Sequence, residues 1–357
     1  MEAQPIVGGS RWRRPRPFEL AAFASAAGAL AFLRWQGLHF GWNTLAYSFR
    51  GWLGAIPGLF VAGVGMQLLL TWLGRRPLRA YVAAAWRWSW IGLWLRAWLV
   101  SALVAYAYVW LKVSIPLVRP ELYDAELWRL DRWLHFGISP TVLAIELVAG
   151  TPVAGLMDRL YALWVPTIPF AFAFVFAATR DDLRRNFMLA NVVAWSLGAW
   201  AYLAVPALGP CYFTPDVLEP VRDAIPQAVE AQRALWDNYL WMVKHRGGML
   251  KSFSPVLGVA AMPSMHVAAF ALFALWARRY DRRFFLPFVA ATALIFFGSL
   301  ATAWHYAIDG YAGVLLAWVA VRIADRFEPV TPETDAREAG AGGSAGGPPE
   351  APRAAAA

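Results

Sequence analysis

Apolar residues occur along this chain in long runs, and short polar connections rich in arginine separate the runs. A run of roughly 17–25 apolar residues is long enough to cross the hydrocarbon core of a bilayer as a helix. A helix also satisfies its own backbone hydrogen bonds in lipid. The pattern therefore predicts an all-α polytopic membrane protein with about eight transmembrane helices. The predicted spans are residues 17–34, 52–74, 96–118, 156–178, 187–208, 255–277, 284–304 and 306–323.

The arginines are grouped in alternate connections between these spans, as the positive-inside rule expects of cytoplasmic loops. Together with the basic N-terminus, they predict that both termini are cytoplasmic and that the protein lies in an inner or plasma membrane. Segments 119–155 and 209–254 and the turn at 304–306 then face the opposite side. The groups are Arg75, Arg76 and Arg79; Arg180, Arg184 and Arg185; Arg278, Arg279, Arg282 and Arg283; and Arg322 and Arg326.

The composition excludes an ordinary soluble domain, because 59% of the 357 residues are hydrophobic and only 15% are charged. In a soluble protein the net charge of +9 would suggest nucleic-acid binding. Here the positions of the arginines attribute the charge to membrane topology, so no nucleic-acid partner is expected. The single cysteine, Cys211, excludes an intrachain disulfide.

Two aromatic and polar segments on the predicted non-cytoplasmic side are expected to form helices on the membrane surface. The first is 123–136, whose acidic residues Asp124 and Asp131 we interpret as structural. The second is 216–246, which mixes aromatic, basic and apolar residues. Aromatic side chains of this kind anchor helices at the interface between lipid and water.

Two short strings contain the residues most suited to chemistry. They are Pro263-Ser264-Met265-His266 and His305-Tyr306-Ala307-Ile308-Asp309. Ionisable side chains are expensive within a membrane and mark candidate functional sites. Both strings lie near the predicted non-cytoplasmic face, so the two histidines can meet. If 305–309 is helical, His305 and Asp309 share one face, and the carboxylate can fix the imidazole tautomer.

This set of residue types suits phosphoryl transfer. A histidine nitrogen is a good nucleophile toward phosphorus, and a second histidine can protonate the departing oxygen. Ser264 and backbone N–H groups at a helix start can hold phosphoryl oxygens. The arrangement requires no metal and no other cofactor. A zinc site formed by His266, His305 and Asp309 is the alternative interpretation.

At these residues the chain resembles the type 2 phosphatidic acid phosphatase superfamily, whose signature has three elements. The first, Lys-x6-Arg-Pro, matches Lys112 to Pro120; the second, Pro-Ser-Gly-His, matches 263–266 with Met265 replacing glycine. The third, Ser-Arg-x5-His-x3-Asp, keeps its histidine and aspartate but has Ser299 at the arginine position. The resemblance covers roughly residues 100–323.

The two departures resemble the inositol phosphorylceramide synthase and sphingomyelin synthase branch of that superfamily, as does the string Trp304-His305-Tyr306. The resemblance implies that His305 is the nucleophile, Asp309 its orienting carboxylate and His266 the acid and base. It further implies phosphate binding by Ser264, Arg119 and Lys112, and a head-group pocket that includes Tyr306, Trp304, Pro210 and Tyr212. Arg119 and Lys112 could instead extend from a span end into the interface, and Pro210 could simply terminate a span.

The predicted organisation has four regions. Residues 1–16 are a basic cytoplasmic N-terminus, and 17–95 contain two additional transmembrane helices with their connection. Residues 96–323 form a six-helix catalytic membrane domain with the phosphatase-superfamily core. The cytoplasmic tail, 324–357, lacks apolar periodicity and is expected to be disordered.

The predicted function is transfer of a phospho-head group, such as phosphoinositol, from a phospholipid donor to a lipid alcohol through a phosphohistidine. With water as acceptor, the same site would be a lipid or polyprenyl phosphate phosphatase. A lipid transporter or flippase is the alternative from another class, because charges within a membrane also mark transport paths. The oligomeric state is left open.

Overall fold

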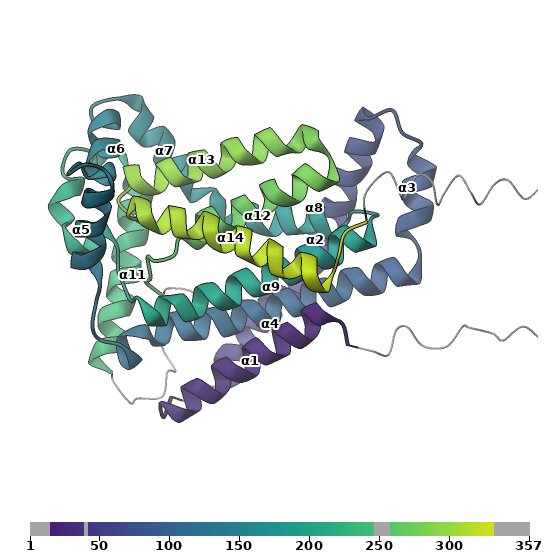
Figure 1. The fold of residues 1–357 in the computed structure, drawn as a ribbon, viewed down its shortest axis with the longest axis horizontal. Helices are drawn as coiled ribbons and strands as arrows, with labels where there is room; N and C mark the ends of the chain where they lie inside the picture. The colour runs from purple at the N-terminus through teal and green to yellow at the C-terminus, as the bar shows by residue number, and fades with distance from the viewer. Residues whose placement is uncertain (1–14, 39–41, 246–257, 332–357) are drawn as a thin grey trace, which may run out of the picture.

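The computed structural model describes residues 15–38, 42–245 and 258–331, and within these ranges all regular secondary structure is helical. The long helices lie side by side along the longest axis of the molecule (Figure 1). The all-α class is therefore confirmed. These helices are α1 (Pro17–Trp35), α2 (Trp42–Leu73), α4 (Trp88–Val118), α9 (Asp181–Ala204), α13 (Phe285–Ala301) and α14 (Ala307–Phe327).

The other helices complete the bundle and close its ends. They are α3 (Leu78–Ala85), α5 (Asp124–Leu134), α6 (Pro140–Val148), α7 (Pro152–Ala162), α8 (Trp164–Phe176), α10 (Pro210–Phe213), α11 (Pro226–Lys244) and α12 (Met265–Tyr280). Three single turns of 3-10 helix are η1 (Pro215–Leu218), η2 (Arg222–Ala224) and η3 (Arg282–Phe284). The two predicted surface segments thus contain α5 and α11.

In the described part of the chain, six helices are long and apolar enough to cross a membrane, whereas the sequence predicts about eight. The window 156–178 is divided between α7 and α8, because Pro166 has no N–H to donate to the carbonyl of Ala162. In the window 255–277, α12 begins only at Met265, where Ser264 caps it. The helices α6 and α7 form a further pair, bent by 119°.

Three tryptophans of α4 belong to the largest hydrophobic cluster among the described residues. Trp90, Trp94 and Trp98 recur every four residues, so they share one face of the helix, and all three are fully buried. Phe60 of α2 meets Trp94 edge to face at 5.0 Å, and Phe176 of α8 meets Trp98 at 5.3 Å. These contacts join one of the two additional N-terminal helices to the rest of the bundle.

Polar contacts also join these N-terminal helices to the core. Glu19 of α1 forms an ion pair with Arg96 of α4. On α2, the Gln67 amide donates to the Phe174 carbonyl at 2.9 Å and accepts from the Tyr280 hydroxyl at 2.6 Å. Burying the Gln67 amide would be unfavourable without these hydrogen bonds, so it favours the packing of α2 against α8 and α12.

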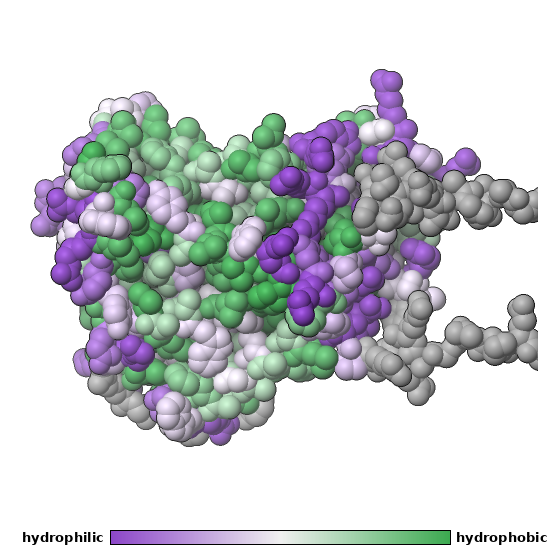
Figure 2. Space-filling view, in the orientation of Figure 1, coloured by the Kyte–Doolittle hydropathy of each residue, from purple (hydrophilic) through white to green (hydrophobic). Residues whose placement is uncertain are grey.

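The two ends of the bundle differ in composition. α1 begins and α14 ends at the same end as α3, while α5, α6, α7 and α11 gather at the opposite end (Figure 1). The arginine-bearing α2–α3, α8–α9 and α12–α13 connections lie at the α3 end. On the face seen in Figure 2, hydrophilic residues gather toward both ends, with a mostly hydrophobic surface between them. The arginine groups of these alternate connections thus lie at one end of the molecule. That this end faces the cytoplasm stays a prediction.

Gly313 allows α14 to approach the start of α12. A Cβ atom at this position would lie 2.4 Å from the Ser264 carbonyl oxygen and 3.3 Å from the Ala268 nitrogen. We predict that Gly313→Ala destabilises the protein by about 1–3 kcal/mol, because backbone must move to admit the methyl group. The matched control is Gly65→Ala in α2, where nothing lies within 4 Å of an added Cβ. Thermal unfolding of the purified variants measures the difference, and equal midpoints would contradict this account of the contact.

Candidate active site

The two histidine strings form two neighbouring helix starts. Ser264 is the N-cap of α12, and its hydroxyl accepts from the Val267 N–H at 3.5 Å, which places His266 in the first helical turn. The second string begins before α14, whose N-cap is Tyr306. The Ser264 N–H donates to the Asp309 carbonyl at 2.9 Å. This bond holds the two helix starts together.

His305 and Asp309 meet although His305 is not helical. Because α14 starts at Ala307, the contact forms across the helix cap: Asp309 Oδ2 accepts from the Tyr306 N–H at 3.0 Å and lies 3.2 Å from His305 Nδ1. His305 is 3% exposed and Asp309 is fully buried. The expected contact between His305 and Asp309 is present, with a capping turn in place of the helical turn that the spacing suggested.

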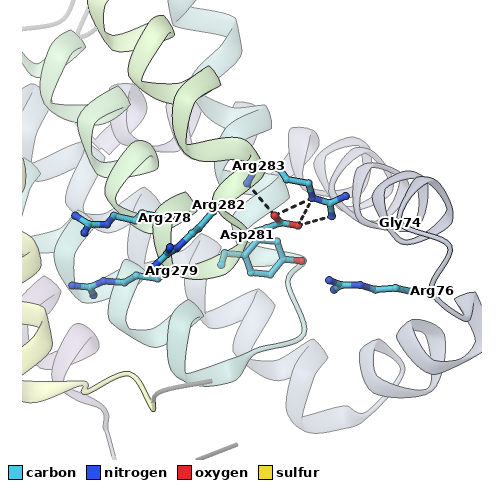
Figure 3. Close-up of a pocket in the computed structure, with 8 residues that line it drawn as sticks. Gly74, Arg76, Arg278, Arg279, Asp281, Arg282 and Arg283 are labelled. Carbon is cyan, nitrogen blue, oxygen red and sulfur yellow. Dashed lines mark hydrogen bonds and ion pairs between the residues drawn. The ribbon is translucent and has the colours of Figure 1, made fainter. Parts of the chain in front are cut away.

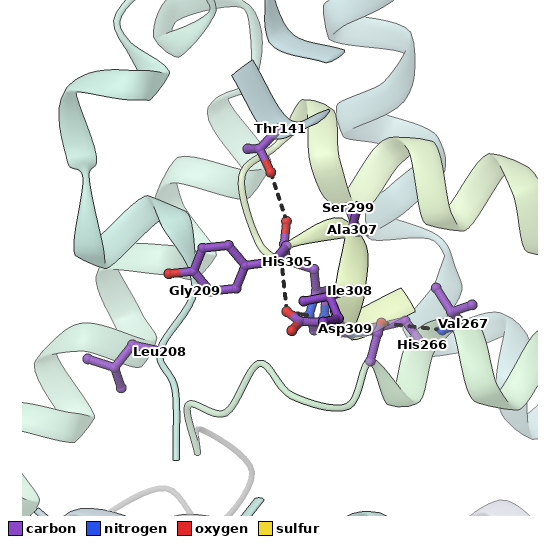
Figure 4. A network of polar contacts seen from close by, with 12 residues as sticks. Thr141, Leu208, Gly209, His266, Val267, Ser299, His305, Ala307, Ile308 and Asp309 are labelled. Atoms are coloured by element: carbon purple, nitrogen blue, oxygen red, sulfur yellow. Dashed lines mark hydrogen bonds and ion pairs between the residues drawn. The ribbon is translucent and has the colours of Figure 1, made fainter. Parts of the chain in front are cut away.

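The two histidines are in direct contact. His266 Nδ1 lies 3.0 Å from His305 Nε2 (Figure 4 labels both histidines). An ionised carboxylate only accepts, so the Asp309 contact assigns the proton of neutral His305 to Nδ1 and leaves a lone pair on Nε2. His266 Nδ1–H is then the donor between the rings. This tautomer leaves the nitrogen of His305 that faces His266 able to act as a nucleophile.

Two aromatic residues that the sequence did not identify surround His266. The Tyr161 hydroxyl lies 3.2 Å from His266 Nδ1, and the Trp164 ring meets the imidazole edge to face at 3.8 Å. They come from the end of α7 and the start of α8, where the predicted span is broken. Neither residue belongs to a recognisable string, so only the tertiary structure places them at the site.

Two of the three acidic residues of α5, Asp124 and Asp131, hold the start of α14. Asp131 accepts from the Ala307 and Ile308 N–H groups at 3.1 and 3.0 Å. Asp124 accepts from the Tyr306 hydroxyl at 2.8 Å and from the Leu208 and Gly209 N–H groups, with a shortest distance of 2.8 Å. Burial raises the pKa of both carboxyls above its ordinary value, while the backbone N–H donors oppose that shift. The two acids therefore have a specific structural role, which is to fix the loop that contains His305.

The sequence carried one signal for this role. Asp124 and Asp131 are seven residues apart, which places both on the same face of a helix. Their backbone partners near 208 and 307 are distant in the sequence, so only the fold identifies them. Figure 4 shows the backbone of Leu208 and Gly209 beside the loop of His305.

The segment before α10 packs directly against the residues that precede His305. Gly209 has φ +105°, and a Cβ atom there would lie 2.4 Å from the Trp304 carbonyl oxygen. After the buried Pro210, the Cys211 N–H donates to the Ala303 carbonyl at 2.9 Å. Only glycine adopts this backbone conformation at such close approach without strain.

The three predicted aromatic pocket residues lie around the same loop. Tyr306 is fully buried, and its hydroxyl is used by Asp124. Tyr212 stacks on Trp236 at 5.3 Å and donates to the Gln232 carbonyl at 2.9 Å. Its ring is 6.4 Å from Trp304, which is partly buried beside His305. Whether these side chains contact a head group stays a prediction.

The predicted phosphate-binding cations differ in placement. Lys112 lies on α4 with its ammonium 5.8 and 5.5 Å from the ring centres of Tyr108 and Tyr202, within electrostatic range of His266. Arg119 is the C-cap of α4, and its guanidinium is 3.7 Å from Glu121, with the side chain 41% exposed. Lys112 thus lies within electrostatic range of His266, whereas Arg119 lies at the helix end in an ion pair.

Ser299 stands at the position where the resemblance expects an arginine. It is fully buried, and its hydroxyl donates to the Phe296 carbonyl at 2.7 Å. Its own carbonyl accepts from the Trp304 and His305 N–H groups at 2.9 and 3.3 Å. Ser299 therefore shapes the loop before His305 through its backbone and carries no charge toward a phosphate.

The two other histidines in the described part of the chain, His135 and His245, do not contact this pair. His135 contacts the Tyr311 hydroxyl at 2.9 Å, His245 contacts the Trp241 carbonyl at 2.8 Å, and His39 is outside the described residues. Across 15–38, 42–245 and 258–331, no three His, Cys, Asp or Glu side chains are arranged to hold a metal ion. The zinc alternative therefore has no assembled ligand set in this part of the chain.

Comparison with known proteins identifies the family. Residues 125–323 match the family model of the PAP2 superfamily, and this range contains both histidine strings and all of α5 except its first residue, Asp124. No curated protein and no solved structure matches the chain. Because the match covers more than half of the chain, the protein belongs to the PAP2 superfamily and is a membrane enzyme of the phosphatase and phosphotransferase type that acts on phosphoesters.

Proposed function

We propose that this enzyme transfers a phospho-head group, such as phosphoinositol, from a phospholipid to a lipid alcohol through a phosphohistidine at His305. The observation that carries the proposal is the chain of contacts from buried Asp309 through buried His305 to partly buried His266, with distances of 3.2 and 3.0 Å. The chain provides an orienting carboxylate, a nitrogen with a free lone pair and a neighbouring proton donor. These are the groups that covalent phosphoryl transfer requires.

In the first half of the reaction, His305 Nε2 attacks the phosphorus of the donor lipid. A nitrogen–phosphorus bond forms, the bond from phosphorus to the diacylglycerol oxygen breaks, and the imidazolium of His266 gives one proton to that oxygen, which leaves His266 neutral. Asp309 stabilises the positive imidazole ring of the intermediate. In the second half, His266 removes the proton of the acceptor alcohol, whose oxygen displaces His305 from phosphorus.

This sequence requires the two imidazoles to separate. An attacking atom lies about 3–3.5 Å from its target, and a general acid lies about 2.6–3.2 Å from the oxygen that it protonates. Both distances cannot be met while His266 and His305 are only 3.0 Å apart. His266 therefore turns away from His305 when a phosphoryl group lies between them, and Tyr161 offers its Nδ1 another hydrogen-bond partner.

Charge at the site supports binding of the phosphoryl group. Lys112 supplies a cation near His266, and the backbone at the start of α12 supplies N–H groups and the positive end of a helix dipole. Ser264 stands at the same helix start. Arg119 joins this set when its guanidinium leaves Glu121 for the substrate, since an exposed ion pair of this kind contributes little to stability.

The acceptor distinguishes a transferase from a phosphatase. We favour a lipid alcohol, because Ser299 carries no charge where the phosphatase pattern has an arginine. Water as acceptor gives the alternative, a lipid or polyprenyl phosphate phosphatase. Comparative lipid mass spectrometry of cells with and without the gene tests this choice: loss of a lipid class with a transferred head group supports the transferase, and accumulation of a phosphate-bearing lipid alone supports the phosphatase.

We predict that His305→Asn lowers turnover by about a thousandfold or more, because asparagine removes the nucleophile while keeping a polar side chain at a buried position. The matched control is His245→Ala at the end of α11, where the histidine is exposed and outside the site. Activity of the purified variants on mixed lipid micelles provides the measurement. Turnover of His305→Asn within tenfold of the unmodified enzyme would rule out a nucleophilic His305.

We predict that the site faces the non-cytoplasmic leaflet, because the arginine-bearing connections lie at the opposite end of the bundle. In a Cys211→Ser background, a membrane-impermeant thiol reagent added to intact cells should label Arg129→Cys on α5. It should label Arg79→Cys on α3 only after the membrane is opened. Both arginines are exposed, so access through the membrane, and not burial, decides the labelling. The reverse pattern would invert the topology.

A further inference from the structure

A second charged feature lies at the opposite end of the bundle from the histidines. The α2–α3 turn and the connection from α12 to α13 enclose a hollow of about 470 Å³. The two segments are about two hundred residues apart in the sequence, so the hollow is a product of the fold. Its lining consists of Gly74, Arg76, Arg278, Arg279, Tyr280, Asp281, Arg282 and Arg283 (Figure 3).

The positive charge in this hollow exceeds the negative charge. Five guanidinium groups line it, with Asp281 as the single carboxylate among its lining residues. Arg283 donates to Asp281 at 2.6 Å, and this hydrogen bond lowers the pKa of Asp281 below its ordinary value, so the carboxylate stays ionised near neutral pH. Arg279 is engaged outside the hollow by Asp325 of α14, at 2.6 and 2.8 Å.

Three of the lining arginines are left without a carboxylate. Within the described ranges, Arg76, Arg278 and Arg282 form no ion pair. All three are exposed, so water and salt screen them in the absence of an anion. Guanidinium groups bind phosphate through two parallel hydrogen bonds, and several around one hollow can engage one phosphate group from more than one side.

Membrane orientation alone does not require arginines from two distant segments to line one hollow. The positive-inside rule depends on the number of basic residues in short loops and not on their mutual positions. Arg75, Arg79, Arg322 and Arg326 supply charge at the same end without lining the hollow. The gathering of five other arginines around one concave surface is therefore a separate property of the fold.

The segments that form the hollow also carry exposed apolar residues. Trp72 and Leu73 directly precede Gly74 and are 62% and 59% exposed, and Leu286, just after η3, is 71% exposed. A head group bound by the arginines would thus be joined to acyl chains next to an apolar surface. Basic pockets between transmembrane helices on the cytoplasmic side bind acidic lipid head groups for this reason.

We propose that this hollow binds the phosphate head group of an anionic phospholipid from the leaflet at the α3 end of the bundle. The ligand is held by Arg76, Arg278 and Arg282, while Arg279 and Arg283 remain tied to Asp325 and Asp281. The site is independent of the proposed reaction, since it lies at the other end of the molecule from His266 and His305. The fraction of enzyme molecules with a lipid in this hollow then depends on how much anionic phospholipid that leaflet contains.

The test is native mass spectrometry of the purified full-length enzyme in detergent, with equal amounts of dioleoyl phosphatidylglycerol and dioleoyl phosphatidylcholine added. We expect the unmodified enzyme to retain phosphatidylglycerol in preference to phosphatidylcholine. The double variant Arg278→Gln/Arg282→Gln should retain at least about fivefold less phosphatidylglycerol, because two unpaired guanidinium groups are lost. Arg326→Gln, which removes one charge from the same end outside the hollow, should match the unmodified enzyme.

A second double variant, Arg278→Lys/Arg282→Lys, keeps the charge and separates loss of binding from loss of folding. It should retain intermediate amounts of phosphatidylglycerol, because lysine binds phosphate as a point charge without the bidentate geometry. The proposal is overturned if the glutamine variant retains as much phosphatidylglycerol as the unmodified enzyme while both elute as single species. It is overturned equally if sodium triphosphate binds at the hollow but phosphatidylglycerol is not retained, since the ligand would then be a soluble anion.

Discussion

The geometry of the proposed catalytic site depends on how buried carboxylates meet the backbone at the start of α14. Three aspartates act there: Asp309 caps its own helix, Asp131 takes the next two N–H groups, and Asp124 binds Tyr306 and the loop before α10. Free N–H groups at a helix start carry partial positive charge and need acceptors when buried. By supplying these acceptors, α5 fixes the loop on which His305 sits.

This arrangement also decides the chemistry available to His305. The carboxylate of Asp309 binds Nδ1 and directs the lone pair of Nε2 toward His266, in surroundings from which water is largely excluded. Asp309 Oδ1 is buried without a hydrogen-bond partner among the described residues. A positive charge that develops on the His305 ring during covalent catalysis is therefore stabilised by the Asp309 carboxylate, which has few other hydrogen-bond donors around it. Electrostatic stabilisation of this kind is strong in a dry, preorganised site.

The features of the fold and site that follow from local sequence could be predicted, and those that depend on distant contacts could not. Apolar runs predicted the helices, and the spacing of His305 and Asp309 predicted their contact. Pro166 divided a window that hydropathy alone treats as one span, since hydropathy does not register a missing N–H. Tyr161 and Trp164 reach His266 only through the packing of α7 and α8 against α12, and no local pattern reports such a contact.

The covalent role of His305 is the central claim, and trapping the intermediate tests it most directly. The enzyme is mixed with a donor phospholipid, quenched within one turnover without acid, digested and examined by tandem mass spectrometry. The account predicts an acid-labile adduct on His305, whose mass corresponds to a phosphorylated head group for the transferase and to a phosphoryl group for the phosphatase. An adduct on another residue, or turnover with no adduct on His305 at any quench time, would contradict it.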